Sequence, residues 1–248
     1  LLHTSEAPLS IRRVTVSTEP NHGKAQEQEL WDRIRTTEGA ERAEVLDELS
    51  HIAYKRDNFI ECLHLVETSI EIYFKHGGLD VYLTELIHLY HGKVHCFENL
   101  KRYEDAARTH EELAIMKFAE SDFEAQAEEL RAAGRAWYRI EEWRKSLDNH
   151  IAAKEITYPE ISTITMGIDL LNIGMALAKL GSYQDAIDNY LRARSLCKEA
   201  KDPEFVHWCD NYLALAYIAL NNGPEAKFHA LHYFNYTKVC EDLGMEAY

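Results

Sequence analysis

Residues that interrupt helices are scarce in this sequence. The 248 residues include only 5 prolines and 11 glycines. Between Ala25 and Pro224 the only prolines are Pro159 and Pro203, and we place both at the starts of helices, where proline is well tolerated. Few segments read as strands. The scarcity of helix breakers and of strand patterns predicts a chain that is mostly α-helical.

Long hydrophobic runs are also missing. The longest apolar stretches, such as residues 212–220, are well short of the roughly 18 to 20 residues that a membrane helix needs. Residues 1–11 have no lysine or arginine ahead of their few apolar residues and no long apolar core, which argues against an export signal. The 5 cysteines are widely spaced and include no Cys-x-x-Cys pair. An odd, scattered set of cysteines fits a reducing compartment, so we expect a cytoplasmic protein.

Positive charge is in the minority. Lysine and arginine number 27 against 42 acidic residues, which gives a formal net charge of −15. Such a charge opposes binding to nucleic acid or to an anionic membrane, and we expect neither as a partner. It does not exclude a peptide partner, because a local cationic groove can exist in an acidic protein.

Sequence patterns of nucleotide sites and hydrolases are absent as well. There is no Gly-x-Gly-x-x-Gly, no phosphate loop and no Gly-x-Ser-x-Gly. We therefore predict no cofactor and a protein that is not an enzyme.

What the chain does contain is a repeat. Small residues recur 40 positions apart at Ala106, Ser146, Ala186 and Ala226, and Cys62 precedes Ala106 by 44. Twelve positions before four of these five residues stands another small residue. These four are Ser50, Gly134, Gly174 and Ala214. Small residues at both positions let two consecutive helices approach closely, so each copy is interpreted as a helical hairpin.

This pattern resembles the tetratricopeptide repeat signature over roughly Glu41 to Glu241. The residues that fit it best, in the fourth copy, are Leu170, Ile173, Gly174, Leu177, Gly181, Tyr183, Ala186, Tyr190 and Ala193. Departures are His110, His150 and Gly223, where the family prefers an aromatic residue, and Lys93, where it prefers an aliphatic one. The usual unit has 34 residues. A 40-residue period therefore implies longer helices, as in adaptors with Leu-Gly-Asn repeats and in Rap-type peptide sensors.

The resemblance implies an all-α, right-handed solenoid of about five helical hairpins over residues 24–248. One additional helix is expected near Ala25–Arg35, after a flexible leader at 1–23. The chain starts at Leu1 rather than methionine, and residues 1–15 are open to interpretation as vector-derived or upstream sequence. The hairpin turns are expected near Asp57, Lys101, Glu141, Gly181 and Asn222.

In the family, the first helix of each repeat lines a concave surface through positions two, five, nine, twelve and thirteen. Transferred to this sequence, with asparagines in or beside this lining, the candidate ligand-binding residues are His91, His95, Arg131, Arg135, Tyr138, Arg139, Asn172, Met175, Trp208, Asn211 and Leu215. The groove would be cationic in repeats two and three and apolar in repeats four and five. Such a groove suits a protein or peptide with an acidic segment, so the function we expect is that of a peptide- or protein-binding adaptor or scaffold.

Several alternatives remain open at this point. The arginines could instead pair with Glu98, Glu128 or other nearby acids. His88, His91 and His95 lie on one helix face and are weak metal candidates beside their interpretation as groove or surface histidines. A sensor that releases a second partner when a peptide binds is the alternative function, and a metal-dependent enzyme is third.

The last predicted helix, from about Pro224 to Glu241, is unusually apolar. Its large residues are Phe228, Leu231, Tyr233, Phe234, Tyr236 and Val239. They would either form the interface of a homodimer or pack inward against Tyr212 and Tyr217.

Overall fold

The computed structural model describes residues 21–156 and 161–242, and within these ranges the chain forms helices and no strand. Side-chain placement is described for 24–156 and 161–238. The helices are α1 (Asn21–Ile34), α2 (Gly39–Tyr54), α3 (Phe59–Lys75), α4 (Leu79–Asn99), α5 (Tyr103–Ala119), α6 (Phe123–Arg139), α7 (Trp143–Glu155), α8 (Thr163–Lys179), α9 (Tyr183–Glu199), α10 (Pro203–Ala219) and α11 (Gly223–Asp242).

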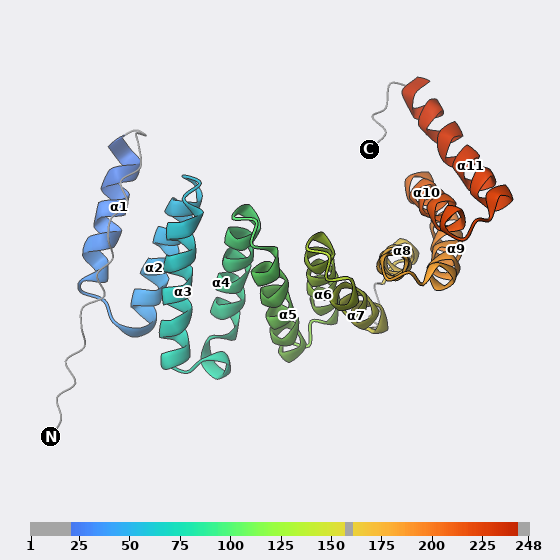
Figure 1. The fold of residues 1–248 in the computed structure, drawn as a ribbon. Helices are drawn as coiled ribbons and strands as arrows, with labels where there is room; N and C mark the ends of the chain where they lie inside the picture. The colour runs from blue at the N-terminus through green and yellow to red at the C-terminus, as the bar shows by residue number, and fades with distance from the viewer. Residues whose placement is uncertain (1–20, 157–160, 243–248) are drawn as a thin grey trace.

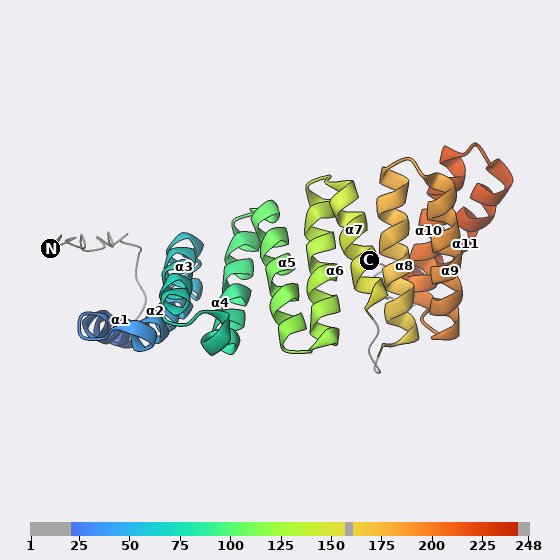
Figure 2. The same ribbon diagram turned by 90° about the horizontal axis from the view of Figure 1, so that it is seen from below.

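Each helix packs mainly on the helices that precede and follow it in the chain. The five hairpins are α2 with α3, α4 with α5, α6 with α7, α8 with α9, and α10 with α11, and α1 packs on α2. Figure 1 shows the hairpins following one another in a single curved row, with α1 and α11 at its opposite ends. Figure 2 shows the middle hairpins side by side. The predicted all-α solenoid is confirmed.

The turn inside each hairpin has the same backbone geometry. The residue at the turn has positive φ, namely Asp57 (56°), Lys101 (58°), Glu141 (65°), Gly181 (82°) and Asn221 (56°). The next residue donates its backbone N–H to the carbonyl five positions earlier, as Arg102 does to Phe97 at 2.8 Å. This bond closes the preceding helix with a Schellman motif. All five predicted turn positions are confirmed to within one residue.

Several helix starts are set by the side chain of the preceding residue. Asn58, Asp122, Ser162 and Asp202 each accept a hydrogen bond from the backbone N–H three residues later. Pro203 occupies the first turn of α10, as predicted. Pro159, the other proline assigned to a helix start, lies outside the described residues, and α8 begins at Thr163.

The small residues at the predicted contact positions allow close approach between the two helices of a hairpin. A Cβ added to Gly134 would lie 2.7 Å from the His150 ring, and one added to Gly174 would lie 2.5 Å from the Tyr190 ring. Both distances are too short for a real methyl group. Glycine is therefore required at these two equivalent positions, 40 residues apart, because a large ring from the second helix fills the space.

The longer spacing between the first two repeats has a local structural cause. Helix α4 has 21 residues, whereas α6 has 17, and the backbone of α4 departs from helical geometry at Tyr82. The residues from Leu79 to Tyr82 thus form an extra turn ahead of a kink. The Tyr82 ring packs on Tyr73, with 4.8 Å between ring centroids. Four additional residues account for a spacing of 44 instead of 40.

The additional helix expected near Ala25–Arg35 is α1. Helix α1 begins at Asn21, so the last three residues assigned to the leader are helical, whereas residues 1–20 lie outside the described residues. Four cysteines of the described residues are buried and form no disulfide: Cys62, Cys96, Cys197 and Cys209. The Cys62 and Cys96 sulfurs, on α3 and α4, approach to 3.1 Å.

Candidate ligand-binding surface

The first helices of successive repeats contact one another through polar side chains. His88 Nε2 on α4 lies 3.3 Å from Asp47 Oδ2 on α2, and His91 Nδ1 on α4 lies 3.7 Å from Glu129 Oε1 on α6. Arg131 on α6 pairs with a carboxylate on α8, and α8 packs directly on α10. These contacts place α2, α4, α6, α8 and α10 side by side. We call the surface that they share the first-helix face.

One row of this face is accessible along the whole array. It consists of the ninth repeat positions, which are His51, His95, Arg135, Met175 and Leu215. Met175 is half-buried, and the other four side chains are exposed, Leu215 by 55%. The row changes from imidazole through guanidinium to apolar groups. A ligand lying along the array would therefore meet different chemistry at each repeat.

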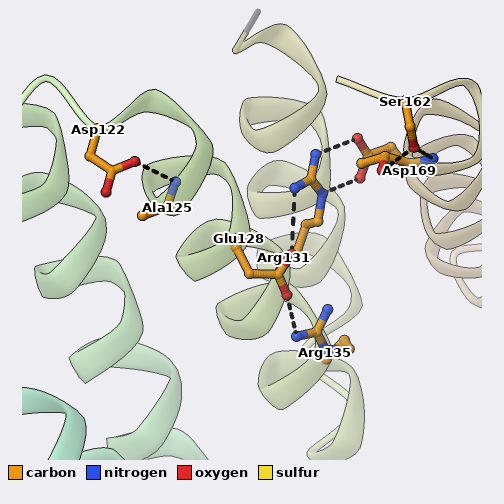
Figure 3. A network of polar contacts seen from close by, with 8 residues as sticks. Asp122, Ala125, Glu128, Arg131, Arg135, Ser162 and Asp169 are labelled. Carbon is orange, nitrogen blue, oxygen red and sulfur yellow. Dashed lines mark hydrogen bonds and ion pairs between the residues drawn. The ribbon is translucent and has the colours of Figure 1, made fainter. Parts of the chain in front are cut away.

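The fifth repeat position has a different role in the middle of the array. Arg131 is only 4% exposed, and its Nε and Nη2 atoms donate to Asp169 Oδ1 and Oδ2 at 2.7 and 2.9 Å. Asp169 is fully buried. Figure 3 shows this two-pronged ion pair between α6 and α8. The structure thus places Arg131 inside an inter-repeat contact rather than on the open surface.

The positions of these two residues in the repeat match those of another contacting pair. Asp169 stands 40 residues after Glu129, and Arg131 stands 40 residues after His91. The pair Arg131–Asp169 is therefore the repeat equivalent of the pair His91–Glu129. Two buried acids one repeat apart, Glu129 and Asp169, therefore indicate a recurring type of contact between repeats. Asp169 was not among the predicted site residues.

Arg135 is exposed but not isolated from acids. Its Nη2 atom lies 3.0 Å from Glu128 Oε1, and the same carboxylate contacts Arg131 Nη1 at 3.5 Å (Figure 3). Beside them lies a cavity of about 380 Å³. Its charged lining residues are Asp122, Glu124, Glu128 and Arg131. Arg131 and Arg135 therefore pair with acids, as the alternative interpretation of the sequence had it. The region around Arg131 is not cationic, because three acids and one arginine line the cavity.

Two cations farther along the face lie over aromatic rings. The Arg139 guanidinium is 5.2 Å from the centre of the Tyr103 ring, and the Lys179 ammonium is 5.3 Å from that of Trp143. Both residues occupy the thirteenth repeat position and are exposed. Neither forms an ion pair with a carboxylate in the described part of the chain. Tyr138 packs edge-on against Trp143 at 4.7 Å, so this predicted residue contacts the ring that lies under Lys179.

The apolar end of the face is continuous with a buried core. Met175 and Trp208 pack against a core cluster that includes Leu171, and the Trp208 ring stacks near Tyr212 at 6.5 Å. Leu215 and Ile218 extend from this base into solvent, Ile218 by 60%. A rigid apolar base with exposed aliphatic side chains is suited to anchoring an apolar side chain of a ligand.

Two half-buried amides lie on the same repeats. The side chains of Asn172 on α8 and Asn211 on α10 form no hydrogen bond with any other residue that the structure describes. Each amide has donors and an acceptor, which match a peptide group of an extended chain. Both were predicted site residues, and their geometry is compatible with that role.

The three histidines of α4 do not converge. His88 contacts Asp47, His91 contacts Glu129, and His95 Nδ1 lies 4.0 Å from Glu98 Oε2. Burial lowers the pKa of His91, and Glu129 acts in the opposite direction. Each of the three histidines thus contacts a different carboxylate, so they do not form the common metal site that their helix spacing suggested.

A second cavity was not anticipated from the sequence. It has a volume of about 550 Å³ and lies between α9, α10 and α11. Its polar lining includes Arg194, Lys198, Lys201, Asp202, His207, Asp210, His232 and Tyr236. Arg194 Nε donates to Asp210 Oδ1 at 2.9 Å, and the His207 ring stacks on Tyr233 at 4.1 Å. Much of this lining is therefore already paired.

Comparison with known proteins gives matches at the level of structure. No family model matches the chain, and no curated protein matches it. No helix in the described residues is both long and apolar enough to cross a membrane.

Similar solved structures are helical repeat proteins. BtubC (BKLC) from P. vanneervenii aligns at a TM-score of 0.61 with 13% identity, covering 88% of this chain and 89% of that one. A putative kinesin light chain from Podosopora anserina, with nearly identical TPR-like repeats, aligns at 0.61 with 14% identity over 82% and 99%. YrrB, a TPR protein with an unusual peptide-binding site, aligns at 0.54 with 12% identity over 84% and 92%. At these identities the likeness concerns the fold.

Proposed function

Because this chain is a tetratricopeptide-like helical repeat protein, we propose that it binds a peptide or an extended protein segment along the first-helix face. Solenoids of this type generally bind peptides or proteins on such a face, because each repeat contacts only its neighbours and leaves one long surface open. They are typically scaffolds rather than catalysts.

The proposal is supported mainly by the accessible row at the ninth repeat position. Acidic ligand residues would meet Arg135 and Arg139, with Lys179 adjacent. Charge-assisted hydrogen bonds to arginine are about twice as strong as neutral ones. Arg139 and Lys179 lie over aromatic rings, and such contacts favour a fixed position of the side chain before a ligand binds. Ordering before binding reduces the entropy that a ligand has to overcome.

Apolar ligand residues would meet the other end of the row. Leu215 would be the exposed anchor, with Met175 and Trp208 beneath it. Asn172 and Asn211 would hold the ligand backbone between these side chains. His91, His95 and Tyr138 would line the face near the N-terminal repeats. Arg131 would act as a positioning residue, because its guanidinium holds α6 against α8 through Asp169.

Selection from a displayed peptide library tests this proposal. We expect the wild-type protein to select peptides that have acidic residues at one end and apolar residues at the other. For these peptides, the double variant Arg135→Glu/Arg139→Glu should lose on the order of tenfold or more in affinity. Leu215→Asp should weaken binding through the apolar end. Affinity should also fall as salt is raised, because the arginines are exposed.

The matched control is Arg108→Glu. Arg108 is an exposed arginine on α5, paired with Glu104 at 2.8 Å, and lies off the first-helix face. Its reversal should leave peptide affinity unchanged. Peptides that bind equally well to the double variant and to the wild type would show that this face is not the binding site.

A further inference from the structure

A different trio of metal-ligating side chains lies on the first-helix face at repeats one and two. Asp47 and His51 are on α2, and His88 is on α4. One ligand atom from each side chain can be chosen such that all three lie within 4.8 Å of one another. In the part of the chain that the structure describes, no other group of three such residues comes this close.

The trio is held in place by contacts among its members and with Ser50. His88 Nε2 is 3.3 Å from Asp47 Oδ2, and His51 Nδ1 is 3.6 Å from Asp47 Oδ1. The two imidazole rings are stacked, with centroids 5.5 Å apart and planes inclined by 15°. Ser50 Oγ donates to the Asp47 carbonyl oxygen at 2.7 Å and also lies 3.3 Å from Asp47 Oδ1. His51 Nδ1 is 2.9 Å from the same carbonyl oxygen, so this ring would bind an ion through Nε2 or after releasing that contact. Contacts of this kind orient metal ligands in known sites.

We propose that Asp47, His51 and His88 bind a divalent transition-metal ion, with Zn²⁺ as the preferred species. Two imidazoles and one carboxylate are a donor set that suits Zn²⁺. Metal–ligand distances near 2 Å require donor atoms about 3 to 4 Å apart, so only small side-chain rotations would close the site. The remaining coordination positions would be open to water or to a donor atom from a bound partner.

The two histidines of the trio are accessible to solvent. His51 and His88 are both more than half exposed as side chains, so an ion could reach them from solvent and the rings could rotate to meet it.

Metal binding at this place would have a structural consequence. The ligands come from the first helices of two adjacent repeats, and Asp47 and His88 are 41 residues apart in the chain. An ion would therefore connect repeat one to repeat two across the first-helix face. Because it would bind the folded chain and not the unfolded one, it should raise the thermal midpoint of unfolding. This proposal is independent of the peptide-binding proposal.

Metal titration of the full chain, free of any affinity tag and stripped of metal, tests the site. With ZnCl₂ in a calorimeter we expect one equivalent to bind, and with CoCl₂ we expect visible absorption bands from the bound ion. Each of His51→Gln, His88→Gln and Asp47→Asn should reduce affinity on the order of tenfold or more. The controls are His64→Gln, an exposed histidine on α3, and His91→Gln, and both should bind as the wild type does.

Three outcomes would overturn the proposal. They are the absence of heat and of cobalt bands, binding that all three variants retain, and a loss of binding that follows His91→Gln instead. Circular dichroism and thermal unfolding in the presence of a chelator show whether each variant still folds. Because the histidines replaced are exposed, their variants should fold and melt like the wild type once metal is removed.

Discussion

At the scale of single residues, His150 is the clearest departure from a repeat pattern. Tyr190 fills the equivalent place in the next repeat, where its ring packs against Gly174. His150 packs against Gly134 in the same way, but its Nδ1 atom has no hydrogen-bond partner among the described residues. Burial first, and then the charges of Arg135 and Arg131, lower its pKa to about 4. The folded protein therefore holds a neutral imidazole.

We predict that this imidazole weakens the protein in acid. Between pH 6.5 and about 4 the unfolded chain binds a proton that the folded chain does not, so the free energy of unfolding falls as pH decreases through this window. From pH 7 to pH 5 the loss from His150 should be about 2 kcal/mol. His150→Phe should remove that loss, because a ring of similar shape fits against Gly134 and carries no titrating group.

Denaturant unfolding at the two pH values checks this prediction. His64→Gln serves as the control, since His64 is exposed and its replacement should leave the pH dependence as in the wild type. An unchanged pH dependence in His150→Phe would contradict the assignment to this residue.

At the scale of helices, the contact between α6 and α8 depends on one buried ion pair. Replacing Asp169 would leave the buried Arg131 guanidinium without its closest carboxylate, and breaking a buried ion pair in this way typically costs about 3 to 5 kcal/mol. We therefore expect Asp169→Asn to lower the free energy of unfolding by about 3 kcal/mol. The double replacement Arg131→Met/Asp169→Leu should recover most of this loss, because no buried charge remains.

The control for the ion pair is Glu128→Gln, which also contacts Arg131 but from an exposed position. Its effect should stay below about 1 kcal/mol, as for other exposed pairs. Chemical unfolding followed by circular dichroism gives the free energies of unfolding of the wild type and of the three variants. If Asp169→Asn were no more harmful than Glu128→Gln, the pair would not hold the two helices together.

At the scale of the whole molecule, the large apolar residues of the last helix were predicted either to form a dimer interface or to pack inward. In α11, some of these side chains pack inward and others are exposed. Tyr233 and Tyr236 pack inward on the His207 ring, at 4.1 and 4.3 Å. Phe228, Leu231 and Phe234 are each at least half exposed. Val239 lies outside the described side chains. The two tyrosines thus pack on His207, whereas Tyr217 meets α11 through His229, with 5.7 Å between ring centroids. An apolar stripe of Phe228, Leu231 and Phe234 stays exposed.

We predict that two copies associate through this stripe. A self-complementary apolar surface closes a two-fold dimer. Light scattering at micromolar concentration should show a dimer that Phe234→Glu converts to monomer. Phe118→Glu on α5 is the matched control, because Phe118 is 59% exposed and Phe234 is 60% exposed. A wild-type protein that remains monomeric throughout would rule out the dimer.

The helices, the turns and the repeat can all be predicted from the amino-acid sequence. These features are local: a helix, a turn and a second helix need small and bulky residues at set spacings within one unit. The roles of Gly134, Gly174 and Gly181 therefore follow from the repeat pattern alone. The accessibility of the ninth repeat position follows from the same periodicity, as Arg135 and Leu215 illustrate.

Which side chains meet across repeats depends instead on the tertiary packing. Arg131 and Asp169 are 38 residues apart, and Asp47 and His88 are 41 apart, so their meeting depends on how the hairpins stack. The sequence places Arg131, Arg135 and Arg139 on one stripe of α6, and helical spacing cannot distinguish them. Stacking of α8 against α6 buries Arg131 against Asp169. Arg135 stays beside Glu128 of its own helix, and Arg139 lies over the Tyr103 ring of α5, because the three side chains meet different neighbours.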